Sequence, residues 1–317
     1  MKKILIFIIL GFQLGNAVEN DTIKANVFKK YYFKPDDDCD ACGCSASGGS
    51  MGFSSMMNNN FVGLRYVYQS YTTKEGIFNN SPWIDEHFKT IQIWSRIPIT
   101  ERIQLTALVP YHSNDRILPT TGKETVQGLG DITVMAMYTV FQTHTDSLTY
   151  SHKLQLGGGV KAPTGKYSTT NNGTLNPSFQ LGTGSWDYML VSEYVFKRKQ
   201  LGLNNAISYT FKTENEKLYQ FGNQLNYGST LFYFLDLNAV KFVPQAGIAG
   251  EVYASNKQVQ QEIPGTKGDI IFSKWGFEVG RNKFSMGVNA MFPINQNLTN
   301  GNVKANYRWG INLNYQL

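Results

Sequence analysis

The sequence contains few of the side chains on which enzymes and metal proteins depend. Its 317 residues include only three cysteines and four histidines. No two histidines stand in the HxH or HExxH spacing of a metal site, and the glycine triplet at 157–159 lacks the trailing GK[ST] of a phosphate-binding loop. These absences argue against catalysis, and we expect that the chain is not an enzyme.

Long hydrophobic runs are missing after the first residues. Two lysines at 2–3 precede an apolar stretch over Ile4–Leu14, and Gly15 and Ala17 are small residues in the −3 and −1 places of a cleavage site. This order predicts a secretory signal peptide over residues 1–17, in preference to a buried first helix. Past that point, no uncharged apolar run approaches the ~18 residues of a transmembrane helix.

Neither sign of charge dominates the sequence, which has 29 Lys and Arg residues against 23 Asp and Glu residues. The formal net charge is +6, and removal of the two lysines of the signal peptide leaves +4. The positive side chains are spread along the chain, so we expect no nucleic-acid partner. Export would also place the mature chain outside the reducing cytosol.

In place of these features, the chain has a strict alternation of apolar and polar residues. In the closing segment NYRWGINLNYQL, residues 306–317, the odd positions are aromatic or aliphatic and the even positions are polar or glycine. Because side chains alternate between the two faces of a strand, one face of this segment is apolar and the other is polar. Segments 103–111, 132–140 and 284–292 follow the same rule.

The alternation predicts an all-β fold with about 12 strands. Their expected bounds are 61–71, 86–98, 101–112, 129–141, 151–162, 185–196, 201–212, 218–233, 239–254, 269–280, 283–292 and 304–317. Such strands are long for a globular sheet and suit a tilted crossing of a membrane. Short turns alternate with longer polar loops, among them 113–128 and 293–303. We therefore expect a transmembrane antiparallel β-barrel over residues 61–317, with both termini on the periplasmic side; a soluble β-sandwich or soluble barrel is the alternative.

The polar faces of the predicted strands identify candidate lumen residues. Charged side chains are costly in hydrocarbon, so they must face water or one another. The candidates are Arg65, Arg96, Lys161, Asp187, Glu193, Glu251, Lys274, Glu278 and Arg308. Two interpretations stay open: a hydrophilic conduit for a small solute, or a salt-bridged plug that stiffens a narrow barrel. In both, outer-membrane lipid surrounds the wall.

Residues 18–60, which precede the first predicted strand, do not alternate. They contain the stretch DDDCDACGC, in which Cys39, Cys42 and Cys44 form a CxxCxC pattern. Thiolates are soft ligands that favour copper(I) and zinc, and the aspartates would attract a cation. A disulfide between two of the cysteines is a serious competitor in the oxidising periplasm. We expect a periplasmic extension or a barrel plug that binds metal, carries a disulfide or does neither.

Three stretches in the middle of the chain share short glycine-based motifs with a known family. They are GLGDITVMAMYTVF at 128–141, LGGGVKAPTGKYS at 156–168 and GTGSWDYMLVSEYVF at 182–196. Over residues 85–317 the chain resembles the outer-membrane β-barrel proteins named as transporters of the MetA pathway of phenol degradation. The resemblance rests on Gly128, Gly130, Asp131, Pro163, Thr164, Gly165, Gly182, Gly184 and Trp186. It implies an outer-membrane barrel that passes small, often apolar compounds.

The motif residues also have architectural explanations. Gly128 and Gly130 permit a bend where the loop enters the strand, and Asp131 could pair with a basic residue of the lumen. Pro163 lies at a strand end, where its missing N–H does least damage. We therefore expect these motifs to shape the barrel rather than to bind substrate.

The sequence thus predicts an outer-membrane channel or transporter that passes a small solute through a polar lumen. One alternative is a metal-binding outer-membrane protein that uses the CxxCxC segment. The second alternative is a structural barrel without transport.

Overall fold

The computed structural model describes residues 55–57, 60–74, 81–119, 122–143, 150–168 and 179–317. All of them belong to the larger of two compact units of the chain, Asp36–Leu317. Within them the regular structure is antiparallel β-strand, apart from one short 3-10 helix, η4 (Thr299–Gly301). No helix in this part of the chain is long and apolar enough to cross a bilayer.

Fourteen strands form one sheet, and three very short strands form a second. The strands of the large sheet are β1 (Phe61–Lys74), β2 (Trp83–Pro98), β3 (Ile103–Leu118), β4 (Gly122–Leu129), β5 (Ile132–Gln142), β6 (Tyr150–Ala162), β7 (Asp187–Arg198), β8 (Leu201–Lys212), β10 (Gln224–Tyr233), β11 (Leu235–Leu237), β12 (Val240–Tyr253), β15 (Gly268–Arg281), β16 (Phe284–Leu298) and β17 (Val303–Gln316). The three short strands are β9 (Tyr219–Gln220), β13 (Lys257–Gln258) and β14 (Gln261–Glu262).

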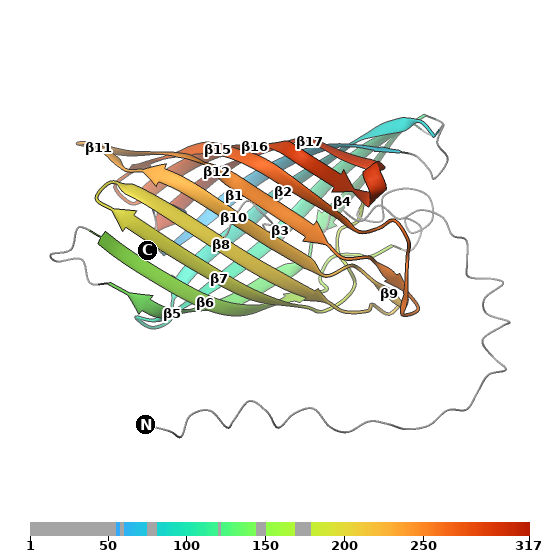
Figure 1. Cartoon of the computed structure of the whole chain (residues 1–317), viewed down its shortest axis with the longest axis horizontal. Helices are drawn as coiled ribbons and strands as arrows, with labels where there is room; N and C mark the ends of the chain where they lie inside the picture. Colours follow the sequence, from blue (N-terminus) through green and yellow to red (C-terminus); the bar gives the residue numbers. More distant parts are fainter. Residues whose placement is uncertain (1–54, 58–59, 75–80, 120–121, 144–149, 169–178) are drawn as a thin grey trace, which may run out of the picture. The chain divides into compact units, whose positions relative to one another are not determined.

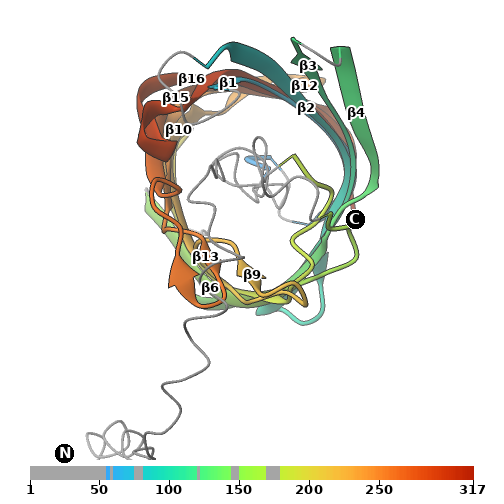
Figure 2. The same ribbon diagram turned by 90° about the vertical axis from the view of Figure 1, so that its right-hand side faces the viewer.

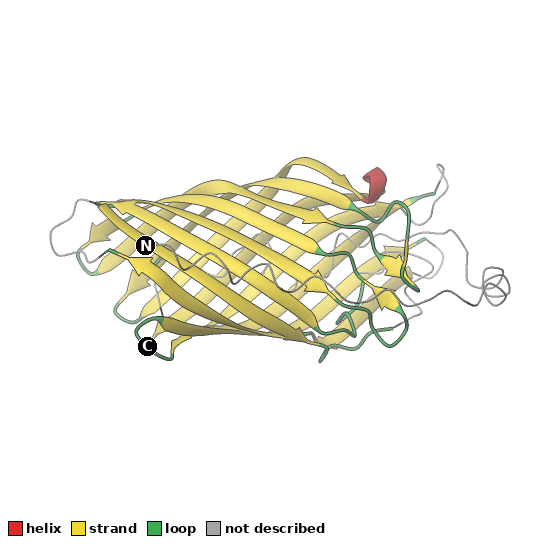
Figure 3. Ribbon diagram, turned by 60° about the horizontal axis from the view of Figure 1, so that its bottom comes forward, coloured by secondary structure: helices red, strands yellow, loops and turns green. Residues whose placement is uncertain are grey.

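The large sheet closes on itself with twelve positions around the ring. β4 and β5 follow one another along β3, and β11 continues the position of β10 beside β12. The ring closes where β1 pairs with β17, from Phe61 opposite Gln316 to Thr73 opposite Val303. Tilted strands form the wall (Figure 1), the ring is seen from its end in Figure 2, and loops and turns lie at the two ends (Figure 3). The prediction of a twelve-stranded antiparallel barrel is confirmed.

Side chains alternate between the outer and the inner face of the wall. On β2, Ile91 and Ile93 are 49% and 55% exposed, whereas Gln92 between them is buried. The same contrast recurs on β15, where Trp275 is exposed and Lys274 is buried. An outer face of exposed aliphatic and aromatic side chains suits lipid rather than water.

Several strands extend beyond the predicted bounds. The loop expected over 113–128 contains the end of β3 and most of β4, and the loop expected over 293–303 contains the end of β16. In these extensions most residues on both faces are polar, so the backbone ladder continues where the hydrophobic alternation has ended. The strand expected over 218–233 is interrupted instead, because Tyr219 and Phe221 are buried away from the wall path and β10 begins only at Gln224.

The inner face is not uniformly polar, which the parity of the strands did not predict. One group of buried residues, called here the loop-end cluster, consists of Tyr71, Phe88, Phe179, Ala249, Tyr253, Ile270, Phe272, Met291, Leu298, Val303 and Ala305. A second group, called here the central cluster, consists of Phe61, Trp94, Leu108, Met135, Met137, Met189 and Val191. The interior therefore combines polar and apolar surface.

Two glycines make room for the central cluster. Gly157 and Gly159 on β6 stand opposite Met137 and Met135 on β5. A Cβ atom at either glycine would overlap the methionine side chain, so bare backbone here lets two adaptable thioethers fill the interior. The glycine triplet is a packing feature of the wall.

Candidate channel interior

The nine charged residues that were candidates for the lumen all lie on wall strands and are buried. Each exposes 8% of its surface or less. They do not converge on one site. Six belong to three ion-pair groups, and Arg65 stacks on a tryptophan. Glu278 holds residues 55–57, and Lys274 forms no ion pair with any residue that the structure describes.

The first ion-pair group joins Lys161 at the end of β6 to Asp187 at the start of β7 and to Asp131 just before β5. The Lys161 Nζ atom lies 2.7 Å from Asp187 Oδ2 and 3.3 Å from Asp131 Oδ2. Asp131 also accepts hydrogen bonds from the Gly165 N–H (2.9 Å) and from the N–H and hydroxyl of Thr183 (2.8 and 3.0 Å). A buried carboxylate needs partners of this kind to offset its lost hydration.

The contacts to Asp131 fix the segment between β6 and β7 against the inner wall. A Cβ atom at Gly182 would overlap the Asp131 carboxylate, and one at Gly165 would lie 2.5 Å from the carbonyl oxygen of Leu181. The backbone therefore passes these groups at a distance that leaves no room for a side chain, so only glycine fits at both positions. Three motifs that suggested the family resemblance thus meet around one carboxylate, in agreement with their architectural interpretation.

Phe179, in the same segment, belongs to the loop-end cluster. Its ring centre lies 6.1 Å from that of Phe88, and the Arg116 guanidinium carbon lies 4.4 Å from it. The loop after β8 contributes Tyr219 and Phe221, whose ring centres are 4.9 Å apart and which are both buried. Side chains from two loops therefore occupy the interior at the long-loop end, where Figure 2 shows chain segments inside the ring.

The second ion-pair group lies within the loop-end cluster. Arg308 on β17 donates hydrogen bonds to both carboxylate oxygens of Glu251 on β12, at 2.7 and 2.9 Å. It also donates to the Tyr71 hydroxyl at 2.9 Å, and the Tyr253 hydroxyl donates to Glu251. The Phe272 ring centre lies 4.4 Å from the guanidinium carbon. This bidentate pair, enclosed by aromatic rings, links strands that are not neighbours in the ring and stiffens the interior.

The third ion-pair group lies nearer the short turns. Arg96 on β2 donates to Glu193 on β7 at 3.1 Å, and Asn204 on β8 donates to the other Glu193 oxygen at 2.8 Å. On β1, the Arg65 guanidinium carbon lies 3.7 Å from the centre of the Trp94 ring. Charged groups and the central cluster therefore share this level of the interior.

Residues just before β1 contact the wall at separated positions of the ring. Glu278 on β15 accepts hydrogen bonds from the N–H groups of Met56 (3.0 Å) and Met57 (3.2 Å). Gln104 on β3 donates a hydrogen bond to the Asn60 side chain at 2.7 Å. Because β15 and β3 are far apart in the strand order, this short stretch crosses part of the interior, where it is visible inside the ring in Figure 2.

A cavity of about 880 Å³ opens at the short-turn end. Its lining includes Met57, Lys241, Arg281 and Ser285, together with residues of the turn that joins β11 to β12. Most of this lining is polar. The cavity forms a vestibule next to the stretch that Glu278 holds.

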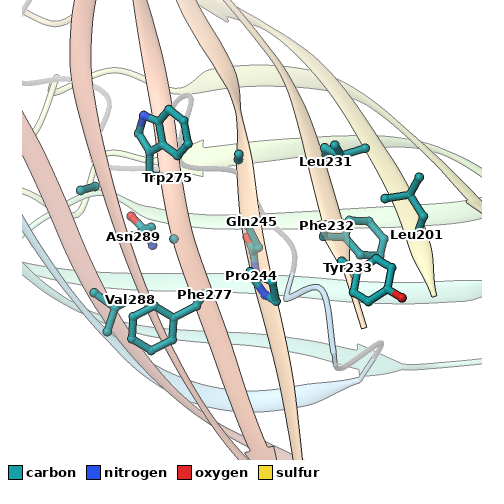
Figure 4. A pocket seen from close by; sticks show the side chains of 13 residues that line it. Leu201, Leu231, Phe232, Tyr233, Pro244, Gln245, Trp275, Phe277, Val288 and Asn289 are labelled. Atoms are coloured by element: carbon teal, nitrogen blue, oxygen red, sulfur yellow. The ribbon is translucent and has the colours of Figure 1, made fainter. Parts of the chain in front are cut away.

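A second hollow, of about 550 Å³, lies in the wall over β10, β12, β15 and β16 (Figure 4). Leu231, Tyr233, Trp275 and Phe277 line it, and each is more than a third exposed. Pro244 lies between Phe277 and Tyr233 in Figure 4. The hollow belongs to the apolar outer face rather than to the interior.

The predicted metal ligands Cys39, Cys42 and Cys44 lie outside the described residues, as does the predicted signal peptide. Within the described part of the chain, no group of three or more His, Cys, Asp or Glu side chains is arranged to hold a metal ion. Copper or zinc binding by the CxxCxC segment stays a prediction.

Sequence reasoning missed the residues that fill and brace the interior. Thr183 lies within the motif around Gly182 and Gly184, so motif spacing could have drawn attention to it. Phe179 and Trp94 carried no such signal, because parity only assigns a residue to a face and says nothing of what meets it across the barrel.

The model of a protein family, described as "Putative MetA-pathway of phenol degradation", matches residues 83–316 of the chain. None of the curated proteins matches the sequence. The matched residues include the three motifs around Asp131 and every wall strand from β2 to β17.

Among solved structures, the chain is similar to the COG4313 outer membrane channel from Pseudomonas putida F1. The TM-score is 0.63 at 14% sequence identity, over 83% of this chain and 97% of that one. The β domain of the Bordetella autotransporter BrkA matches with a TM-score of 0.49 at 10% identity, over 82% of this chain and 100% of that one. A Pseudomonas aeruginosa FadL homologue matches with a TM-score of 0.40 at 10% identity, over 89% and 98%. The first of these similarities supports the barrel fold.

Proposed function

The chain belongs to the family described as the MetA-pathway of phenol degradation, and on that premise we propose that it is an outer-membrane channel for a small solute. Support for the location comes from a closed barrel whose outer face is apolar and exposed. Support for transport comes from the similarity of its fold to an outer membrane channel.

The solute that we propose has an apolar body and a polar or anionic group. The observation that carries this proposal is the mixed interior, in which the Arg65 guanidinium lies on Trp94 within the central cluster. Lys274 adds a buried ammonium that forms no ion pair with a described residue. A wall of this kind offers an apolar surface and a positive charge at the same level, which is the usual pattern of a small-molecule site.

Uptake into lipid vesicles tests the proposal. Purified protein is reconstituted, and the entry of benzoate is compared with that of a neutral sugar of similar size. Ionised benzoate crosses bare lipid slowly, so we expect uptake to exceed that of protein-free vesicles, and benzoate to enter faster than the sugar. Uptake equal to that of protein-free vesicles for both solutes would refute a channel and favour a structural barrel. Equal entry of both solutes would keep the channel and refute the solute class.

We also propose that residues 1–17 are a signal peptide and that residues 18–60 form a periplasmic extension or plug, with Cys39, Cys42 and Cys44 as ligands for copper or zinc. The support is the CxxCxC spacing beside four aspartates. Elemental analysis of anaerobically purified protein, compared with a triple Cys→Ser variant, tests the metal. Equal copper and zinc contents in both proteins would exclude these ligands.

A further inference from the structure

Basic residues gather on one sector of the outer face, at the long-loop end. They are Lys74 on β1, Lys89 on β2, Lys123 on β4 and Lys304 on β17. Strand pairing places them together, since β17, β1, β2, β3 and β4 follow one another in the sheet. The other described wall strands differ over the halves that lie nearest the long loops. There, the alternation of side chains places only one charged residue on the outer face, Asp269 on β15. On the described wall strands, outward positive charge at this end is therefore confined to this sector, which we call the lysine sector; Lys166, Lys217 and Lys267 lie in loops outside it.

Trp83 lies at the centre of the lysine sector. The Nζ atom of Lys304 lies 4.7 Å from the centre of its ring, and that of Lys74 lies 5.6 Å from it. Neither lysine forms an ion pair with a described residue. Two like charges so close to one ring repel each other, and an anion that contacts both ammonium groups would remove that repulsion. Trp83 is 40% exposed and Lys304 is exposed, so a ligand can reach this place from outside the barrel.

The neighbouring acidic groups do not cancel this charge. Asp115 on β3 is shared between Lys89, with which it forms a close ion pair, and Lys123 at 3.7 Å. Asp85 accepts a hydrogen bond from the Thr72 hydroxyl at 3.3 Å and lies beyond ion-pair distance of Lys74 and Lys304. Four lysines against two aspartates leave a net positive surface.

Aromatic rings mark the depth of the lysine sector in a membrane. Next to it, Tyr68 stacks between Tyr307 and Trp309, at ring-centre distances of 6.0 and 5.8 Å. Rings of this kind collect at the boundary between headgroups and hydrocarbon. Exposed aliphatic residues such as Ile91 and Ile93 follow below. The lysines thus stand at headgroup level, on the long-loop rim that faces the cell exterior in barrels of this type.

We propose that Lys74, Lys304 and Trp83 bind a phosphate group of the phosphorylated glycolipid that forms the outer leaflet of this membrane. Thr72 and Asn306, which share a hydrogen bond of 3.0 Å beside the lysines, then face its sugar hydroxyls. The inference rests on the proposed outer-membrane location but not on transport. It assigns the outer face a ligand of its own, separate from any solute in the interior.

Native mass spectrometry of the purified full chain tests this site, with bisphosphorylated lipid A and its enzymatically dephosphorylated form as probes. A lysine near an anionic lipid surface changes an affinity by about fivefold, so the double variant K74Q/K304Q should bind the phosphorylated probe about 25-fold more weakly. The matched control is R198Q/K283Q, which removes two cations from rings at the short-turn end, those of Tyr150 and Tyr315. It should bind as the wild type does.

The outcomes separate this site from the channel. An equal loss in both double variants, or equal binding of the two probes by the wild type, would overturn the proposal. If the double variant does not fold, the single variants Lys74→Gln and Lys304→Gln carry the same test, each with about a fivefold loss. Vesicle uptake of benzoate by K74Q/K304Q should match the wild type, so a failed channel and a failed lipid site give different results.

Discussion

The two ends of the barrel interior are braced in different ways. At the long-loop end, a segment that continues into wall strands at both ends is fixed by Asp131, and Phe179 completes an aromatic cluster around the Arg308–Glu251 pair. At the short-turn end, residues 55–57 form hydrogen bonds with the Glu278 carboxylate, and Asn204 Nδ2 lies 3.9 Å from the Met56 sulfur. The first arrangement has many independent contacts, whereas in the second the backbone N–H groups of Met56 and Met57 share one carboxylate.

This difference suggests which end controls passage. A loop that is fixed at several points forms part of the barrel and permanently narrows its interior. A stretch whose backbone N–H groups share one wall carboxylate, beside a vestibule of about 880 Å³, can shift with less disturbance of the wall. We therefore expect the long-loop end to limit the flux of solute and the short-turn end to modulate it.

The largest effect is expected from Asp131→Ala. It removes the acceptor of three hydrogen bonds and one partner of Lys161, and breaking such a buried charged group costs about 3–5 kcal/mol of unfolding free energy. Urea unfolding in lipid vesicles measures the loss, and benzoate uptake should rise as the loop detaches. Glu101→Ala, at an exposed turn residue, is the control. An Asp131 variant as stable as this control would show that the loop is held elsewhere.

A smaller opening of the same end is expected from Phe179→Ala. Removal of the ring leaves a gap beside Phe88 and Arg116 in the loop-end cluster, while the Asp131 contacts remain. Single-channel conductance should rise several-fold with little change in unfolding. Phe292→Ala on the outer face, where the side chain is 50% exposed, removes the same atoms and should leave conductance unchanged. An equal conductance in both variants would contradict a narrowing at Phe179.

Glu278→Ala should loosen the other end. The Met56 and Met57 N–H groups lose a charged acceptor, and a hydrogen bond to a charged group contributes about 1.5–3 kcal/mol. Hydrogen exchange at these two amides should accelerate, with only a small change in conductance. Glu262→Ala, in an exposed strand, is the control. Unchanged exchange in Glu278→Ala would mean that the stretch is held by other contacts.

The smallest effect on conduction is expected from Arg96→Gln. It removes one positive charge from the level of the central cluster and leaves Glu193 with its hydrogen bond from Asn204. Ion selectivity should shift slightly toward cations, as measured by the reversal potential in a salt gradient. Arg96→Lys keeps the charge and should keep the wild-type potential, so a shift in that variant would point to altered shape instead of charge.

The alternation of residues was sufficient to predict the wall of this barrel, because membrane and interior impose opposite demands on the two faces of each strand. It failed where both faces meet water, as in β4, which was expected to be loop. It also could not pair residues across the interior: Asp131 and Thr183 are 52 residues apart in sequence. Met135 and Met137 fit inside only because Gly159 and Gly157 face them. Contacts of this kind depend on the register of paired strands and on where a loop folds back, which no local pattern encodes.

Single-channel recording of three proteins in planar bilayers tests the central claim most directly. Wild type, Phe179→Ala and Glu278→Ala are compared under identical salt. The account predicts that the wild type conducts, that Phe179→Ala conducts several-fold more, and that Glu278→Ala stays near the wild type. A wild type that never conducts, or a larger increase in Glu278→Ala than in Phe179→Ala, would contradict a channel limited at its long-loop end.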